Sequence, residues 1–362
     1  MTDYPALLRE IAVPRLAGSL SQARMMEPLK RELTNRGFTI AEQRFRAKPT
    51  GLIAMAFLGG VVAWTGLAVL SFGSAEPGSD VSRFVLIGLG LAALFLGTPL
   101  RGALGGRATG AINLIATRGE QTPRVWLVAH YDAKGQVFSM ATRLLLAGCA
   151  GLGATALLAL AALARLGAAP PAVAWTAAAI AALLGGGPLT LNAWLRDSPG
   201  AVDNATGILT VLSIVDRLPP GASIGVLLPD AEELGLVGAR AFARQHRELL
   251  RDAIVVNVDG IDDRGATIGL VHRAGPTVDA VTAALGARRA RWLPVVVDGL
   301  ALRAAARECM TVMRGGWATM RVVHTRRDTA NRLTLQGVRE VAEGVAVGLV
   351  PTLKGGLGGT MP

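Results

Sequence analysis

The chain has 362 residues, enough for one large domain or two ordinary ones. Its residues are 51% hydrophobic but only 4% aromatic, so Ala, Leu, Val and Gly supply an apolar character that is high for a soluble protein and typical of lipid-facing helices. The net charge of +11 comes without an aromatic-interleaved basic patch or a nucleic-acid motif, which argues against nucleic acid as a partner and favours anionic lipid headgroups.

The first segment, residues 1–50, is polar and charged. It has no apolar run before a small-residue cleavage site, so we predict no secretory signal. Apolar residues at helical spacing predict an amphipathic helix over Ser21–Gly37. The two cysteines of the chain, Cys149 and Cys309, form neither a disulfide framework nor a zinc-knuckle spacing, and we predict two buried, reduced thiols.

Four long runs contain no charged residue: Gly51–Phe72, Phe84–Leu100, Leu144–Ala164 and Ala172–Leu195. A membrane span needs roughly 20 apolar residues, and the shortest run, Phe84–Leu100, is at the lower limit. A core helix of a large soluble protein could explain one such run. Four of them favour transmembrane helices.

Short connections join these runs into two predicted transmembrane hairpins, residues 51–100 and 144–195. The second connection ends in Pro170-Pro171, a turn signal. Cationic residues crowd the ends of the runs opposite to the connections: Arg44, Arg46, Lys48, Arg101, Arg107, Lys134, Arg143 and Arg196. The positive-inside rule therefore predicts an integral membrane protein with both termini and all polar segments in the cytoplasm.

Two hairpins leave the polar segments on one side, so residues 1–50, 101–143 and 196–353 can form one domain. Strand patterns at Ala111–Ala116, Val125–Ala129, Ile224–Leu228, Ile254–Val258, Thr267–Val271 and Arg321–Val323 alternate with helix patterns at Thr206–Leu218, Gly235–His246, Thr277–Leu285 and Leu333–Leu349. This alternation predicts a layered α/β fold with ligands at the carboxyl ends of its strands. The glycine-rich residues 354–362 are predicted to be a flexible tail.

Candidate metal ligands follow several of the predicted strands. His130 ends a strand two residues before Asp132, and a carboxylate can orient an imidazole that binds metal through its other nitrogen. A structural histidine would look the same. Asp203 opens a predicted helix, where it could also be a helix N-cap.

Glu232 and Glu233 directly follow another predicted strand. Adjacent carboxylates repel each other unless a cation lies between them, and one can bind metal while the other takes a proton from water. A solvated helix start would explain the pair equally well. Asp259 ends a further apolar strand and His324 ends the last one, and Asp328 could brace His324 or its neighbours.

The combination is more specific than its parts. Two His, two Asp and one Glu suit two zinc ions that share a bridging carboxylate and keep an open position for water. The other two histidines of the chain, His246 and His272, lack such settings and are predicted to be surface or structural residues.

In this order the segments resemble the co-catalytic zinc aminopeptidases, a family that includes glutamate carboxypeptidase, glutaminyl cyclase and the transferrin receptor ectodomain. The resemblance begins at residues 13–19 (VPRLAGS) and 113–116 (NLIA), runs through the five motifs and excludes the four apolar runs. It implies a mixed sheet sandwiched between helices, and hydrolysis of the N-terminal bond of a peptide with a free N-terminus.

The resemblance implies that five side chains hold two zinc ions: His130, Asp203, Glu233, Asp259 and His324. His130, Asp203 and Asp259 would hold one ion, and Asp203 would bridge to the second. It further implies that Glu232 is the general base and that Asp132 orients His130. The chain departs from the soluble pattern because the hairpin 144–195 separates His130 from Asp203, and the other hairpin follows the N-terminal helix.

Other functions stay open at this point. A non-catalytic binding or scaffold protein could share the fold, and so could a glutaminyl cyclase-like acyltransferase with a single zinc. A transporter is less consistent, because the four apolar runs lack the ionisable residues that mark ion pathways. Neither the oligomeric state nor the residue preference follows from the sequence.

Overall fold

The structure, a computed structural model, describes residues 2–48, 50–72, 88, 108–192, 194–195 and 197–355. It divides into two compact units. The α/β unit comprises residues 1–47, 108–135 and 195–362, and the helical unit comprises residues 48–107 and 136–194. The chain therefore leaves the α/β unit twice and returns to it twice. The short strands β4 (Gly135–Gln136) and β5 (Trp194–Leu195) pair where it leaves and returns the second time.

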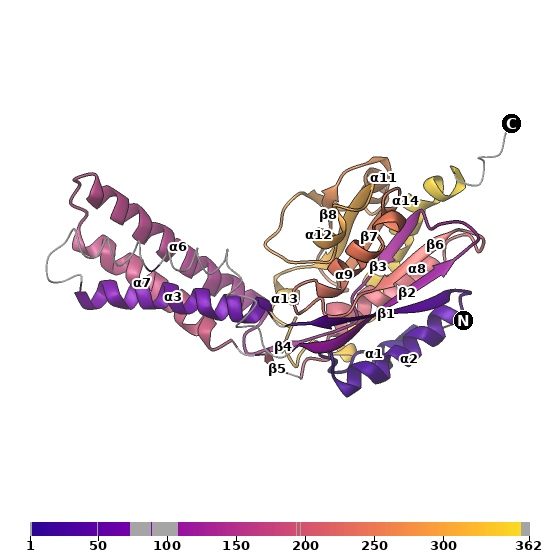
Figure 1. Cartoon of the computed structure of the whole chain (residues 1–362), viewed down its shortest axis with the longest axis horizontal. Helices are drawn as coiled ribbons and strands as arrows, with labels where there is room; N and C mark the ends of the chain where they lie inside the picture. Colours follow the sequence, from indigo (N-terminus) through magenta and orange to yellow (C-terminus); the bar gives the residue numbers. More distant parts are fainter. Residues whose placement is uncertain are drawn as a thin grey trace. The chain divides into compact units, whose positions relative to one another are not determined.

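An eight-stranded sheet forms the centre of the α/β unit, in the order β1-β2-β6-β3-β7-β10-β8-β9 (Figure 1). Its strands are β1 (Thr39–Ala47), β2 (Thr109–Arg118), β3 (Val125–Val128), β6 (Ile224–Leu228), β7 (Ile254–Ile261), β8 (Ala266–Arg273), β9 (Arg288–Ala290) and β10 (Glu308–Gly315). The central strands β6, β3, β7 and β10 are parallel, whereas β1, β2 and β8 join the sheet antiparallel to a neighbour. The predicted mixed sheet is therefore confirmed.

Helices cover both faces of this sheet. Those of the α/β unit are α1 (Tyr4–Ile11), α2 (Leu20–Thr34), α8 (Thr206–Val215), α9 (Val237–Gln245), α10 (Arg247–Leu250), α11 (Pro276–Ala284), α12 (Gly299–Leu302), α13 (Trp317–Met320) and α14 (Gln336–Gly355). Side chains of α1, α2, α8, α11 and α14 build the larger apolar core, and those of α9 and α12 build the smaller one. Because helices shield β3 and β6 on both faces, every residue of these two strands is buried.

The helical unit contains α3 (Thr50–Phe72), α6 (Met140–Arg165) and α7 (Ala172–Thr190). Helices α6 and α7 are long and apolar enough to cross a membrane. They approach closely, since a Cβ added at Gly185 would lie 2.2 Å from the backbone nitrogen of Ala150. The predicted run Phe84–Leu100 falls almost wholly outside the described residues, so the four predicted spans stay a prediction.

The strand predicted at Arg321–Val323 is wrong. These residues form turns after α13, in which the amide of Val322 donates to the carbonyl of Thr319 at 3.0 Å. The last strand in chain order is instead β10, which was not predicted from the sequence. Among the cysteines, Cys309 is buried as predicted, but Cys149 is only partly buried; both are free thiols.

Candidate metal centre

The parallel register of three central strands brings their carboxyl ends to one edge of the sheet. Val128 of β3 is level with Leu227 of β6 and with Asn257 of β7. The residues that follow these positions therefore meet at the same edge, where α/β sheets bind their ligands. They carry His130, the pair Glu232-Glu233 and Asp259.

The turn before α8 carries Asp203 to the same place. Asp203 lies in the short element η1 (Ala201–Ala205), which leads into α8. Gly200 precedes it with a φ of +60°, and a Cβ there would lie 2.4 Å from the carbonyl oxygen of Asp203. Because only glycine tolerates both conditions, the shape of this turn depends on Gly200. Asp328, which was predicted to brace His324 or its neighbours, accepts hydrogen bonds from the amides of Val202 and Asp203 at 2.8 and 3.2 Å.

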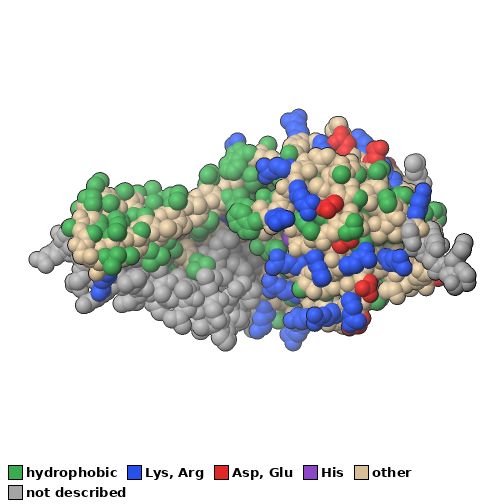
Figure 2. All heavy atoms as spheres, turned by 90° about the horizontal axis from the view of Figure 1, so that it is seen from above, with side chains coloured by type: hydrophobic (Ala, Val, Ile, Leu, Met, Phe, Trp, Pro, Cys, Tyr) green, Lys and Arg blue, Asp and Glu red, His purple; other side chains and the backbone are tan. Residues whose placement is uncertain are grey.

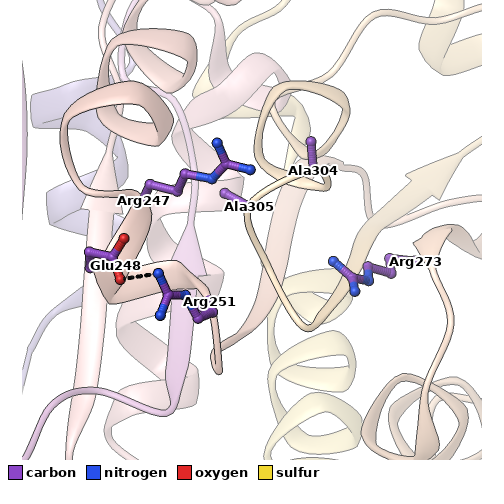
Figure 3. Close-up of a pocket in the computed structure, with 6 residues that line it drawn as sticks. All are labelled: Arg247, Glu248, Arg251, Arg273, Ala304 and Ala305. Carbon is purple, nitrogen blue, oxygen red and sulfur yellow. Dashed lines mark ion pairs between the residues drawn. The ribbon is translucent and has the colours of Figure 1, made fainter.

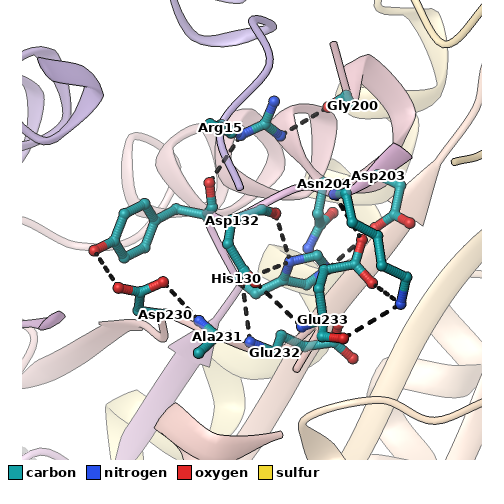
Figure 4. Close-up of polar contacts among 12 residues, drawn as sticks. Arg15, His130, Asp132, Gly200, Asp203, Asn204, Asp230, Ala231, Glu232 and Glu233 are labelled. Atoms are coloured by element: carbon teal, nitrogen blue, oxygen red, sulfur yellow. Dashed lines mark hydrogen bonds and ion pairs between the residues drawn. The ribbon is translucent and has the colours of Figure 1, made fainter. Parts of the chain in front are cut away.

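Two groups of side chains share Asp203. One contains His130 and Asp259, the other Glu233 and His324, and within each group the potential ligand atoms lie within 4.8 Å of one another. His130 Nε2 is 3.1 Å from Asp203 Oδ1 and 3.7 Å from Asp259 Oδ1. His324 Nε2 is 2.8 Å from Asp203 Oδ2 and 3.2 Å from Glu233 Oε1. The five side chains named as candidate ligands from the sequence therefore converge, and Figure 4 shows three of them.

His324 reaches this cluster from a turn and not from the end of a strand. Its backbone has a φ of +65°, a conformation that residues other than glycine seldom adopt. In this turn the imidazole points toward the cluster, and its Nε2 lies 2.8 Å from Asp203 Oδ2.

Asp132 binds the backbone of the glutamate pair. Its Oδ1 accepts the amide of Glu232 at 3.1 Å, and its Oδ2 accepts the amide of Glu233 at 3.2 Å. His130 Nδ1 is 3.1 Å from the carbonyl oxygen of Asp132 and 3.6 Å from Oδ1. The closer contact to the imidazole is thus made by the main chain of Asp132, and its carboxylate mainly holds the turn that carries Glu232 and Glu233.

The two adjacent glutamates are electrostatically different. Burial raises the pKa of Glu232 well above its ordinary value, with the charge of Glu233 adding to the rise against the opposing effect of His130. Burial also raises the pKa of Glu233, but His324 and Lys134 outweigh it and bring this pKa down to about 2. Glu232 is therefore suited to hold a proton, and Glu233 to stay ionised.

Asp203 is held in its ionised form. Burial disfavours the charged carboxylate, yet contacts with His130 and His324 hold the pKa of Asp203 well below its ordinary value. An ionised carboxylate whose two oxygens face different imidazoles suits a bridging position between two cations. With imidazole nitrogens and carboxylate oxygens as donors, both groups fit a borderline-soft divalent ion such as zinc.

Three residues near this cluster were not predicted from the sequence to belong to it. Arg15 is fully buried and donates to the carbonyls of Tyr131 and Gly200, both at 2.8 Å, so it ties the His130 and Asp203 segments together. Lys134 forms a salt bridge with Glu233. Asp298 is buried, and in the described part of the chain neither of its carboxyl oxygens has a hydrogen-bond partner.

Burial raises the pKa of Asp298 to about 8, and its charge in turn raises the pKa of Glu232. Asp298 follows three consecutive valines, at residues 295–297, and this acidic residue after an apolar run was the one sequence signal for it. Lys134 lies two residues after Asp132 in the sequence, but only the tertiary structure shows that its side chain points toward Glu233.

The remaining two histidines lie elsewhere. His272 Nε2 is 2.8 Å from Thr311 Oγ1. The ring of His246 packs on that of Phe242, with their centroids 4.9 Å apart. Both histidines thus contact side chains outside the candidate metal centre.

A separate cavity of about 360 Å³ lies near the opposite end of β7 (Figure 3). Its lining residues are Arg247, Glu248, Arg251, Arg273, Ala304 and Ala305. Arg251 pairs with Glu248 at 2.5 Å and precedes the start of β7, whereas Asp259 lies near the end of that strand. Since it also lacks a histidine, this cavity is not the candidate metal centre.

Residues 187–348 match peptidase family M28. This segment includes Asp203, Glu232, Glu233, Asp259 and His324, and His130 precedes it. No curated protein matches the chain by sequence.

Several solved structures have a similar fold. The zinc aminopeptidase BSAP from Bacillus subtilis shares 11% identity and a TM-score of 0.57, over 97% of this chain and 94% of that one. The aminopeptidase from Aneurinibacillus sp. strain AM-1 shares 12% identity and a TM-score of 0.53, over 96% and 92%. Porphyromonas gingivalis glutaminyl cyclase shares 14% identity and a TM-score of 0.53, over 96% of each chain. At such identities the likeness shows the fold alone.

Proposed function

We propose that the chain, whose residues 187–348 match peptidase family M28, is a zinc-dependent exopeptidase of the aminopeptidase type. One observation carries the proposal: two groups of His and carboxylate ligands share Asp203, next to a glutamate whose pKa is raised. Function follows the site and not the fold, so the proposal depends on these side chains.

We propose that the site holds two zinc ions. His130, Asp203 and Asp259 would bind one, and Asp203, Glu233 and His324 the other. When bound, such ions polarise a carbonyl and make water a nucleophile at neutral pH.

The protein's own groups then handle the proton. Glu232 takes a proton from the attacking water and returns it to the nitrogen of the leaving amine as the C–N bond breaks. The second proton of the water leaves the new carboxyl group for the amine, so the products are a carboxylate and an ammonium group. The pKa of Glu232 is raised above its ordinary value, so its carboxyl group holds the transferred proton more firmly than an ordinary glutamate would. Asp132 fixes Glu232 through its amide, and Asp328 fixes Asp203 in the same way.

The decisive experiment measures release of amino acids from peptides by the detergent-purified protein. Unblocked peptides should be shortened from the N-terminus, N-acetylated peptides should not, and a chelator should stop the reaction. Glu232→Gln should abolish turnover and still bind nearly two equivalents of zinc. Full activity of this variant would contradict the assignment.

The same experiment separates two alternatives. A binding or scaffold protein on this fold would bind no zinc or release nothing. A glutaminyl cyclase-like enzyme would convert an N-terminal glutamine into a cyclised end without releasing an amino acid, and would need a single zinc.

We further propose that the helical unit anchors the protein in a membrane. Several large side chains of α6 and α7 are exposed in the described part of the chain, for example Leu152 at 75% and Leu184 at 61%. On the face in Figure 2, hydrophobic side chains dominate the described part of the helical unit, whereas Lys and Arg gather on the α/β unit. Exposed leucines suit a lipid environment, and the arginines suit anionic headgroups.

The charge distribution supports a cytoplasmic location for the α/β unit. In intact cells, a membrane-impermeant maleimide should label a cysteine introduced at Ala169, between α6 and α7, and should leave a cysteine at Arg289 unlabelled. The reverse pattern would invert the orientation, and labelling of both positions would argue against membrane insertion.

A further inference from the structure

Lys134 lies beside the candidate metal centre, in the loop after β3. Its Nζ is 2.5 Å from Glu233 Oε2 and 3.4 Å from the carbonyl oxygen of Glu233, and its side chain is only 13% exposed. The ion pair is therefore largely shielded from water. Charge interactions are strong in such a shielded site.

The two oxygens of the Glu233 carboxylate have different neighbours. Oε1 lies 3.2 Å from His324 Nε2, toward the group that it forms with Asp203, and the backbone amide of Lys134 donates to it at 3.3 Å. Oε2 is bound by the ammonium of Lys134. Lys134 thus leaves one oxygen of Glu233 for a cation and occupies the other.

In the described structure, the other group of ligands, formed by His130, Asp203 and Asp259, has no such contact with a lysine. In the part of the chain that the structure describes, the ion pairs of Asp203 and Asp259 are made with histidines, and Lys134 is the one lysine or arginine that pairs with a proposed ligand. The two metal positions therefore differ in their direct contacts: the Lys134 ammonium touches a ligand of the Asp203–Glu233–His324 position, whereas the buried Arg15 acts without an ion pair on Asp203, which both positions share, and on Glu233.

We propose that Lys134 makes the two metal positions unequal, lowering the affinity of the Asp203–Glu233–His324 position for its ion. This rests on the proposed two-zinc site. Like charges repel in a shielded site. In addition, Lys134 already balances the buried negative charge of Glu233 when no metal is bound. Binding of the ion therefore gains less free energy from pairing that charge. The exopeptidase would then hold one ion firmly and acquire the other according to zinc supply.

Removal of the ammonium should leave Glu233 in place. The amide of Lys134 and the imidazole of His324 contact Oε1 independently of the lysine side chain. The effect of a substitution on metal affinity should therefore report charge, and not the loss of a positioning contact.

The test is a competitive zinc titration of the metal-stripped, full-length protein in detergent, against a chromophoric chelator. Four variants are compared with the wild type: Lys134→Gln, which keeps a donor, Lys134→Met, which removes it, Lys134→Arg, which keeps the charge, and Arg289→Gln as a surface control. Arg289 forms a salt bridge with Asp279 that is about half exposed.

We expect two unequal dissociation constants in the wild type. Lys134→Gln and Lys134→Met should tighten the weaker site about 10-fold or more, the scale of outer-shell effects on metal affinity, and leave the tighter site unchanged. Lys134→Arg and Arg289→Gln should stay near the wild type. Circular dichroism checks folding, and the zinc-induced rise in Tm should be larger in Lys134→Gln.

The titration distinguishes a failure of the inference about Lys134 from a failure of the proposed function. If the wild type binds two zinc ions and both neutral variants bind them equally well or more weakly, the inference about Lys134 fails and the proposed function stands. If the wild type binds no zinc, the proposed function fails and the inference fails with it.

Discussion

Asp132→Asn tests the idea that one carboxylate holds the turn that carries the proposed general base, Glu232, and a proposed metal ligand, Glu233. The carboxylate accepts the amides of Glu232 and Glu233 at 3.1 and 3.2 Å and is fully buried. Asparagine keeps the shape but replaces one acceptor oxygen with an NH₂ group, which must face an amide donor. The charge-assisted hydrogen bond to that amide is lost, and the buried amide is left without an acceptor, which should cost about 1–3 kcal/mol.

Metal affinity should fall as well. Once the turn is loosened, Glu233 is no longer fixed toward His324, and loss of such an outer-shell partner typically lowers metal affinity about 10–100-fold. The assays are unfolding of the metal-free protein in urea, followed by tryptophan fluorescence, and the competitive zinc titration.

A matched control is Asp263→Asn. The Asp263 carboxylate also binds two backbone amides, those of Thr334 and Gly337 at the start of α14, but Asp263 itself is partly exposed and lies in the loop between β7 and β8. This variant should lose about 0.5–2 kcal/mol, the usual range for a helix N-cap, and keep wild-type zinc affinity. If Asp132→Asn also kept wild-type zinc affinity, Asp132 would support the fold only, and our reasoning about the turn would be refuted.

Two further predictions concern pH and helix packing. Burial, with a contribution from Arg303, lowers the pKa of His272 to about 4, below the value near 6.5 expected when unfolded, so its stabilising effect is complete above about pH 6.5 and is lost as pH falls toward 4. His272→Asn should reduce the loss of unfolding free energy between pH 7 and pH 5 by about 1 kcal/mol after allowance for partial exposure, and an unchanged loss in urea titrations would contradict this. Gly185→Leu should force α6 and α7 apart and lower stability by about 1–3 kcal/mol, seen as a lower Tm in detergent. Gly148→Leu, where a Cβ meets open space, should be tolerated, and equal Tm values for the two variants would argue against close packing at Gly185.

Local patterns in the sequence were sufficient for much of the fold. The apolar run Ile224–Leu228 predicts β6 with the observed bounds, since a strand buried on both faces is continuously apolar. The runs Leu144–Ala164 and Ala172–Leu195 likewise predict α6 and α7 to within a few residues, because length and apolar composition alone define such helices. Residue types and their order were also enough to select the five candidate ligands.

Long-range contacts decided the rest. No local pattern states that β3 lies between β6 and β7, yet this order brings His130 and Asp259 to one edge of the sheet. The apolar residues Val322 and Val323 look like a strand, but they pair with no strand among the described residues, and His324 reaches the site from a turn.

Whether a polar side chain matters depends on what surrounds it, and only the folded chain decides that. Lys134 and Asp298 look like ordinary charged residues in the sequence. In the tertiary structure, Lys134 forms a largely buried ion pair with Glu233, and Asp298 is buried without a hydrogen-bond partner among the described residues. The chemistry of the candidate site thus follows from residue type, which the sequence states, and its electrostatics follow from distance and burial, which arise when segments far apart in the chain come together.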